Sequence, residues 1–171
     1  WSGYDPVREK EAASALLAMG ADVLASSAGT AQPQLAARER GALSIGYHYD
    51  MASDVGDTVL TSAVWNWGVK YVDIARRIAE GAYASEEYWG GMADRIVDLA
   101  PMSSRVPPAV ATLVQSERNR IMSGANQVFV GPLVDNLGNL CVPAGQVLTD
   151  AQLLNMNWFV QGVSAEGSRC N

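Results

Sequence analysis

The feature that most constrains the fold of this chain is the regular alternation of helix and strand patterns in its first half. Asp5 followed by Pro6 is typical of a helix start, because aspartate caps free backbone N–H groups and proline suits the first helical turn. From there the sequence predicts helices over 7–19, 32–40 and 69–80, and strands over 21–25, 42–46 and 58–62. This rhythm is typical of parallel strands joined by covering helices. We therefore predict an α/β fold whose parallel sheet is flanked by helices.

In such a sheet, ligands bind beyond the carboxyl ends of the strands, so the loops after Ala25, Gly46 and Ser62 are expected to meet at one edge. Aromatic and polar residues gather in or near these loops and ahead of the first helix: Trp1, Tyr4, Tyr47, His48, Tyr49, Asp50, Trp65 and Trp67. Aromatic faces stack on flat heterocycles, and polar groups fix their orientation. The pattern favours a small-molecule site. The alternatives are internal packing for each aromatic residue and a cap or turn role for Asp50.

The last third of the chain has a different pattern. A strand is predicted over 95–99 and a helix over 109–123. Segments 127–132 and 140–143 flank a turn-rich stretch and are predicted to pair as a hairpin. Thr149 is expected to cap the start of the terminal segment.

The residue types argue against several functions. A formal net charge of −6 with scattered basic residues argues against nucleic acid as a partner, since phosphate binding needs clustered Lys and Arg. Phosphate-binding glycine motifs and metal-ligand clusters are absent from the sequence, so no cofactor or metal is predicted. His48 is the single histidine and no serine lies in a Gly-x-Ser-x-Gly turn, which argues against an enzyme. Cys141 and Cys170 are either two free thiols or one bridge.

Three stretches resemble the basic membrane protein family of substrate-binding lipoproteins. The first is Trp1-Ser2-Gly3-Tyr4-Asp5-Pro6 with Glu9 and Glu11, followed by Gly20-Ala21-Asp22-Val23-Leu24. The second is Ile45-Gly46-Tyr47-His48-Tyr49-Asp50-Met51 followed by Val59-Leu60-Thr61-Ser62. The third is Val128-Phe129-Val130-Gly131-Pro132 with Asp135-Asn136-x-Gly138, then Met156-Asn157-Trp158-Phe159-Val160-x-Gly162-Val163. Their order and spacing extend the resemblance over nearly the whole chain.

The resemblance implies a type I periplasmic-binding fold, in which two α/β lobes joined by a hinge close on a small-molecule ligand. The ligand is then passed to the permease of an ABC transporter. In the family as a whole the ligands are purine bases or nucleosides. The resemblance also implies a periplasmic or extracytoplasmic location, with membrane anchoring through an N-terminal lipoprotein segment that this chain lacks.

The same resemblance implies how the chain is divided. Residues 1–67 would form the α/β core of the second lobe, and 68–90 a hinge-crossing helix that packs on a first lobe. Residues 91–171 would supply the return strand, a helix, a hairpin and the C-terminal segment of the second lobe. Because the first lobe is absent from the sequence, we expect the helix to expose apolar surface, which a homodimer could cover.

The resemblance also assigns expected ligand contacts. Tyr4, next to Trp1, matches an aromatic residue that stacks on the base, and Ser27 and Gly29 match a loop whose backbone approaches the ligand. The remaining expected contacts are His48, Asp50 and Trp65. Asp50 matches the second acid of a Gly-x-Asp-x-Asp loop, His48 replaces the first acid, and Trp65 stands where many members have a lysine. The loss of an acid and a lysine, with the gain of an aromatic ring, favours a free purine base over a nucleoside.

Two other functions compete with transport. The same fold could serve as a ligand-sensing regulatory domain, which a DNA-binding or signalling module elsewhere in the protein would indicate. An enzyme built on this fold is the third alternative, for which a single histidine offers little chemistry.

Overall fold

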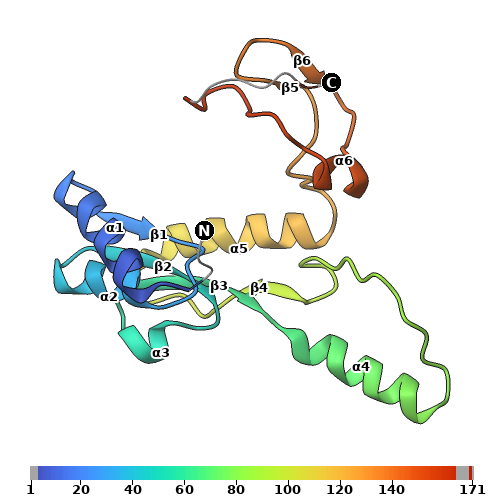
Figure 1. Cartoon of the computed structure of the whole chain (residues 1–171), viewed down its shortest axis with the longest axis horizontal. Coiled ribbons are helices and arrows are strands. Elements are labelled where there is room, and N and C mark those ends of the chain that lie inside the picture. The colour runs from blue at the N-terminus through green and yellow to red at the C-terminus, as the bar shows by residue number, and fades with distance from the viewer. Residues whose placement is uncertain (1–3, 165–169, 171) are drawn as a thin grey trace. The chain divides into compact units, whose positions relative to one another are not determined.

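The computed structural model describes residues 4–164 and 170 of the chain (Figure 1). The chain divides into two compact units, residues 1–119 and 120–171. The first unit contains α1 (Pro6–Ala18), β1 (Val23–Ala25), α2 (Gln32–Glu39), β2 (Leu43–His48), α3 (Ala52–Val55), β3 (Val59–Trp65), α4 (Trp67–Ala79), β4 (Val97–Leu99) and most of α5 (Pro108–Met122). The second contains β5 (Leu133–Val134), β6 (Leu140–Val142) and α6 (Asp150–Leu154).

The sheet of the first unit has the order β1-β2-β3-β4. Strands β1, β2 and β3 are parallel, as the sequence predicts, and β4 runs antiparallel to β3. The three parallel strands therefore present their carboxyl ends at one edge. The α/β fold with a sheet flanked by helices is confirmed, with a mixed rather than wholly parallel sheet.

Two predicted strand ends are wrong. The sequence places the ends of the second and third strands at Gly46 and Ser62, but β2 continues to His48 and β3 to Trp65. The reason is that pairing continues beyond the predicted ends, with Tyr47 opposite Ala63 and His48 opposite Val64. Tyr47 and His48, which the sequence placed in a loop, are thus the last paired residues of β2. The single-turn helix α3 was not predicted either.

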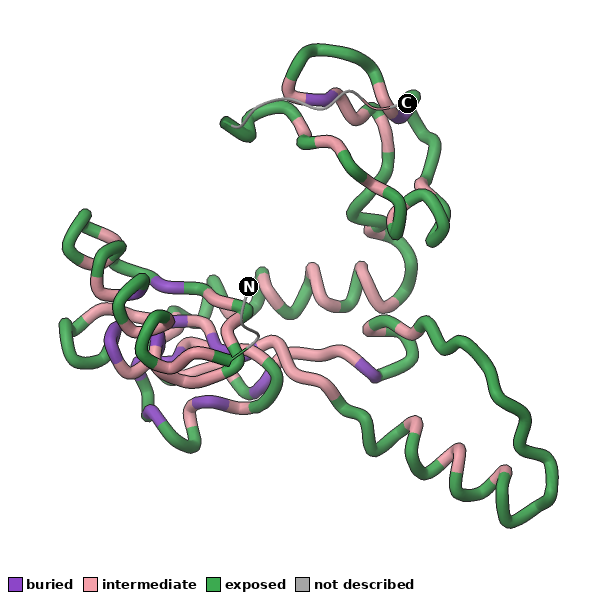
Figure 2. The backbone as a smooth tube through the Cα atoms, viewed as in Figure 1, coloured by how far each residue is buried: buried purple, intermediate pink, exposed green. Residues whose placement is uncertain are grey.

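The core of the first unit lies between the sheet and the helices that follow its strands. One buried cluster joins Ala13 of α1, Leu24 of β1, and Ala36 and Ala37 of α2. Small alanine side chains let the two helices approach each other and the sheet closely. Figure 2 shows that most of the buried residues lie in this part of the first unit.

A second cluster consists of Met51, Val55 and Val59, all nearly inaccessible to solvent. It lies beside Gly46, where an added Cβ would collide with the Ser62 hydroxyl and press on the Met51 side chain. The buried Ser62 hydroxyl accepts a hydrogen bond from the Met51 N–H at 3.2 Å. Glycine is needed at 46 because the chain after β2 folds back tightly onto β3.

Helix α4 contrasts with the rest of the first unit because none of its residues is buried. It extends away from the sheet in Figure 1, and the following chain returns beside it. Glu86 on the returning chain pairs with Lys70 at 2.5 Å and with Arg77 at 2.8 Å, and Lys70 lies 4.1 Å from the Tyr88 ring centroid. The helix also exposes large apolar side chains: Val69, Tyr71, Val72 and Ile78. Among the described residues, no helix combines the length and apolar character needed to cross a membrane.

Strand β4 holds helix α5 through a two-pronged ion pair. The Arg118 guanidinium donates from Nε to Asp98 Oδ1 at 2.6 Å and from Nη2 to Asp98 Oδ2 at 2.5 Å. This fork geometry matches the two donors of arginine to the two oxygens of a carboxylate. The hydrogen bonds from Arg118 lower the pKa of Asp98 below its ordinary value.

In the second unit the predicted hairpin is half right. Strand β6 lies where the sequence places it, but its partner is β5 at Leu133–Val134 rather than the segment 127–132. That segment pairs elsewhere: the Leu148 N–H donates to the Phe129 carbonyl at 3.2 Å. The predicted Thr149 cap is confirmed as a capping box with Gln152 at the start of α6.

The two cysteines form one bridge, which resolves the alternatives left open by the sequence. The Cα atoms of Cys141 and Cys170 lie 5.6 Å apart across this disulfide. The bridge ties the end of the chain to β6.

Candidate ligand-binding site

The carboxyl ends of β2 and β3 bring together the aromatic residues that the sequence analysis singled out. Tyr47 and Trp65 meet edge to face, with ring centroids 6.5 Å apart and an interplanar angle of 76°. The rings of Tyr47 and His48 lie 4.0 Å apart. Three side chains from two neighbouring strands thus form one aromatic cluster at the predicted edge.

The cluster continues into the first turns of α4. The Trp65 and Trp67 rings are stacked, with centroids 5.6 Å apart and planes 12° apart. Trp67 in turn stacks on Tyr71 at 6.3 Å and 18°. Tyr71 is one helical turn after Trp67, so the two rings lie on one helix face. The result is a row of four rings, Tyr47, Trp65, Trp67 and Tyr71, in which Tyr47 meets Trp65 by an edge and the other three are stacked; we call this row the aromatic stack.

The far end of this aromatic stack is open to solvent. Trp67 is 44% exposed and Tyr71 is 62% exposed, whereas Trp65 is half-buried between its neighbours. Planar faces that are held rigidly and remain accessible can accept another flat ring at low entropic cost. Trp67 was noted in the sequence as part of an aromatic group, and Tyr71 was missed. Its spacing of four residues from Trp67 on an expected helix is the signal that could have found it.

His48 turns the chain at the end of β2. Its φ of 72° lies in the left-handed region, which is uncommon for a residue other than glycine. After this turn the Tyr49 hydroxyl donates to Asp54 Oδ2 at 2.6 Å, and that bond raises the pKa of Tyr49. Tyr49 is therefore bound to α3 instead of joining the aromatic stack.

Asp50 fixes the start of α3. Its Oδ1 accepts a hydrogen bond from the Ala52 N–H at 3.1 Å, and its carbonyl accepts from the Ser53 hydroxyl at 2.8 Å. These contacts are the local turn role that the sequence left as an alternative, while Met51 is the N-cap residue of α3. The side chain is partly exposed at the same edge as His48.

The remaining expected contacts lie near the carboxyl end of β1 or before α1. Ser27 and Gly29 are exposed in the loop that follows β1. Tyr4 is 69% exposed and directly precedes the cap residue Asp5 of α1. Trp1 lies outside the described residues. No aromatic contact joins Tyr4 to the aromatic stack within 4–164.

Metal binding finds no support in the part of the chain that the structure describes. The one cluster of possible ligands there is Asp135 with Cys141 and Cys170, whose ligand atoms lie within 4.8 Å of one another. Both sulfurs are joined in the disulfide, and a metal needs them as thiolates. The absence of a resident metal or cofactor remains a prediction from the sequence.

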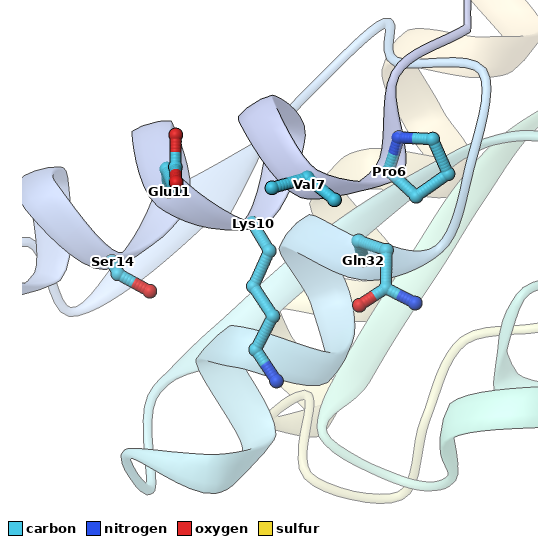
Figure 3. A pocket seen from close by; sticks show the side chains of 6 residues that line it. All are labelled: Pro6, Val7, Lys10, Glu11, Ser14 and Gln32. Atoms are coloured by element: carbon cyan, nitrogen blue, oxygen red, sulfur yellow. The ribbon is translucent and has the colours of Figure 1, made fainter.

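A groove on the outer side of the helix layer is separate from this edge. Figure 3 shows it between α1 and the start of α2, with Lys10 reaching toward α2. Its lining residues are Pro6, Val7, Lys10, Glu11, Ser14 and Gln32. The groove contains none of the residues expected to contact a ligand.

The fold is shared with solved structures of two solute-binding proteins and of a protein with a regulatory title. An ABC transporter solute-binding protein of Conexibacter woesei matches with a TM-score of 0.59 and 24% identity, over 73% of this chain and 43% of that one. A solute-binding protein of Aeropyrum pernix K1 matches with a TM-score of 0.57 and 20% identity, over 71% and 44%. A Bacillus halodurans protein described as a transcriptional activator of the comK gene matches with a TM-score of 0.63 and 25% identity, over 72% and 44%.

The sequence then defines the family. The family described as "ABC transporter substrate-binding protein PnrA-like" matches residues 2–128, so the chain belongs to this family of non-enzymatic substrate-binding proteins. A purine-binding protein of Brucella abortus (strain 2308) is 34% identical over 162 residues, which cover 95% of this chain and 46% of the relative. A Haloferax volcanii protein named as an ABC transporter glucose-binding protein is 26% identical over 163 residues, covering 95% and 39%. The chain thus spans less than half the length of these curated relatives.

Proposed function

We propose that this chain contributes the ligand-stacking lobe of an ABC-importer protein that captures a purine base. The observation that carries the proposal is the aromatic stack at the carboxyl ends of β2 and β3, in which Trp65 and Trp67 lie nearly parallel at 5.6 Å. A purine is a flat heterocycle that gains stacking energy on such faces. The similarity to the purine-binding relative supports the same ligand class.

Around this stack, the polar residues of the edge would orient the ligand. His48 ends β2 and Asp50 follows it, and Ser27 and Gly29 follow β1, so polar side chains and backbone come from the carboxyl ends of two neighbouring strands. Tyr4 and Trp1 would add aromatic contact from the segment before α1. Asp50 already accepts one hydrogen bond at Oδ1 from its own turn, which leaves Oδ2 to face a ligand donor. No lysine is present among these residues to hold a ribose, which favours a base over a nucleoside.

Transport is favoured over regulation as the role of this site. Family membership and the name of the Haloferax volcanii relative point to ABC transport. The matched protein with a regulatory title resembles the chain in fold at 25% identity, and a fold alone does not define function. The permease of an importer would be the protein partner. The location would be extracytoplasmic, with anchoring by a lipoprotein segment of the complete protein.

The exposed apolar side of α4 supports a two-lobe arrangement. We propose that residues 1–67 and 91–171 belong to one lobe, and that 68–90 crosses to pack on another. Val72 and Ile78, which are 70% and 59% exposed, would be covered there. Their exposure is unusual for an isolated unit, and the relatives are more than twice as long as the matched region. A homodimer of this chain would cover the same surface in another way.

Native mass spectrometry of the purified chain with adenine, hypoxanthine, guanine, guanosine and glucose tests the proposal. A purine-base adduct is expected, and the same spectra separate a monomer from a homodimer. Trp65→Ala should weaken base binding by about 1–3 kcal/mol, the usual contribution of one stacked base. Trp89→Ala is the matched control, because Trp89 is 62% exposed outside the aromatic stack.

Two results would contradict the proposal. Binding of glucose in preference to every purine would assign the site to sugars, in line with the name of the second relative. Equal affinity of Trp65→Ala and Trp89→Ala for the base would show that the aromatic stack does not hold it.

A further inference from the structure

The loop between β1 and α2 is held at both of its ends by buried or half-buried side chains. At one end, Gln34 donates from Nε2 to the Ser26 hydroxyl at 3.1 Å and to the Ile45 carbonyl at 3.0 Å. Gln34 is completely buried, so these bonds fix the loop to the neighbouring strand β2. Between Ser26 and Thr30 lie Ser27 and Gly29.

At the other end of the loop the partner is Glu9 of α1. Glu9 Oε2 accepts a hydrogen bond from the Thr30 N–H at 3.2 Å and a second, short one from the Thr30 hydroxyl. The Thr30 hydroxyl also accepts from the Gln32 N–H at 3.2 Å. The start of α2 and the end of the loop therefore both depend on the Glu9 carboxylate.

The second oxygen of the same carboxylate reaches a different segment. Glu9 Oε1 accepts a hydrogen bond from the backbone N–H of Asp5 at 3.3 Å. Asp5 directly follows Tyr4, and its own side chain caps α1 by accepting from the Arg8 N–H. One carboxylate thus joins the segment that carries Tyr4 to the loop that carries Ser27 and Gly29, and Glu9 lies 21 residues before its loop partner Thr30.

The chemistry requires a carboxylate at this position. All three of its partners donate hydrogen bonds, and an ionised glutamate is purely an acceptor. Glutamine has the same size, but its NH2 group would face a donor on one side. Glu9 is half-buried beside the apolar side chains of Ala12, Ala25 and Ala28, where an unmatched donor is costly.

We infer that Glu9 is a positioning residue that holds the Tyr4 segment and the Ser27–Gly29 loop in one geometry, so that the two respond to a ligand as a single unit. The effect of Glu9 on ligand affinity rests on the proposed function, because Tyr4, Ser27 and Gly29 are proposed ligand contacts. Glu9 itself acts through the Asp5 and Thr30 backbones.

The first experiment needs no ligand. Amide hydrogen exchange is compared in the intact chain, Glu9→Ala and the control Glu11→Ala, which removes the same side chain from an exposed position on α1 that lines the groove of Figure 3. Exchange at both the Asp5 and Thr30 amides should accelerate in Glu9→Ala, which removes both acceptor oxygens, and stay unchanged in Glu11→Ala. Acceleration at only one of these amides, or at neither, would overturn the inference.

The second experiment measures the affinity for the purine base that binds the intact chain. Glu9→Gln should weaken binding about tenfold, the usual effect of losing a charged hydrogen bond, while Glu11→Gln binds normally. The effects of Tyr4→Ala and Ser27→Ala should be coupled in the intact chain and additive when Glu9→Gln is present.

The two experiments separate the possible failures. Additive effects of Tyr4→Ala and Ser27→Ala in the intact chain, or normal affinity in Glu9→Gln, would overturn the role of Glu9. If no purine binds the intact chain, the proposed function fails, and the exchange of the Asp5 and Thr30 amides still decides whether Glu9 joins the two segments.

Discussion

The two units of this chain are stabilised in different ways. Among the described residues, the buried apolar side chains lie in the first unit with the single exception of Val142. The first unit combines a layered hydrophobic core with a ladder of parallel strands. The second unit has strands of two and three residues and a helix of five residues. A segment with so little apolar burial needs other constraints to keep one structure.

Those constraints are a disulfide and a buried carboxylate. Asp135 is wholly buried in the second unit. Its oxygens accept hydrogen bonds from the Leu137 N–H at 2.9 Å, the Asn139 N–H at 2.8 Å and the Asn139 side chain at 2.9 Å. The turn between β5 and β6 is thus built around one charged group. The comparison shows that polar bonds and a covalent link take over where the hydrophobic core is too small.

The largest expected effect comes from removing the disulfide. It closes a loop with a sequence separation of 29 residues, which predicts a loss of about 3–4 kcal/mol in the stability of the second unit. Replacement of both Cys141 and Cys170 by serine should therefore accelerate amide exchange throughout 120–164. The core of the first unit should keep its protection. Equal loss of protection in both units would show that they unfold as one.

A core truncation in the first unit should destabilise the first unit and leave the stability of the second unit unchanged. Met51→Ala empties the space beside Val55 and Val59, and we expect a cost of roughly 2–3 kcal/mol. This lies near the lower end for such changes because the single-turn helix α3 can shift into the gap. Denaturant unfolding followed by amide exchange checks the result, with Met19→Ala as control because Met19 is 84% exposed. A similar loss in the control would argue against the core described here.

The smallest expected effect is the loss of stability of the second unit at acid pH. Burial alone would raise the pKa of Asp135, but hydrogen bonds from Asn139 and Leu137 outweigh it and lower the pKa. A lowered folded pKa adds stability above the unfolded value of about 3.9, and that stability is lost as the pH falls from there through the folded pKa.

Thermal unfolding of the second unit between neutral pH and about pH 3 tests this dependence. The intact chain should lose stability in the acid part of this range, and Asp135→Asn should be less stable at neutral pH with a flatter acid response. Asp150→Asn, at an exposed position in the same unit, should retain the acid transition. An unchanged transition in Asp135→Asn would assign it to another group.

Much of the first unit could be predicted because its signals are local. The cap at Asp5, the helix patterns and the positions of the first three strands along the chain followed from residues close together in sequence. The ends of β2 and β3 could not be placed, because they depend on Tyr47 and His48 finding partners on another strand. For the same reason the antiparallel direction of β4 and the partner of β6 were missed. The sequence of one segment alone contains little information about which distant segment it pairs with.

The candidate site was likewise predicted only in part. The sequence named Tyr47, His48 and Trp65, and the strand register brings them together. It quoted Glu9 only as part of a family-like stretch and gave it no role, since a glutamate on an amphipathic helix is normally solvated and its partner Thr30 lies 21 residues away. All of the expected ligand contacts remain predictions: Trp1, Tyr4, Ser27, Gly29, His48, Asp50 and Trp65.

The stacked Trp65 and Trp67 rings also give the molecule an optical reporter. The chain has five tryptophans, and these two lie at one edge of the sheet within 5.6 Å of each other. Indole emission depends on the polarity around the ring and on neighbouring rings that quench it. A molecule that covers the open end of the stack should therefore change the intrinsic fluorescence, so occupancy could be followed in solution without attaching a dye.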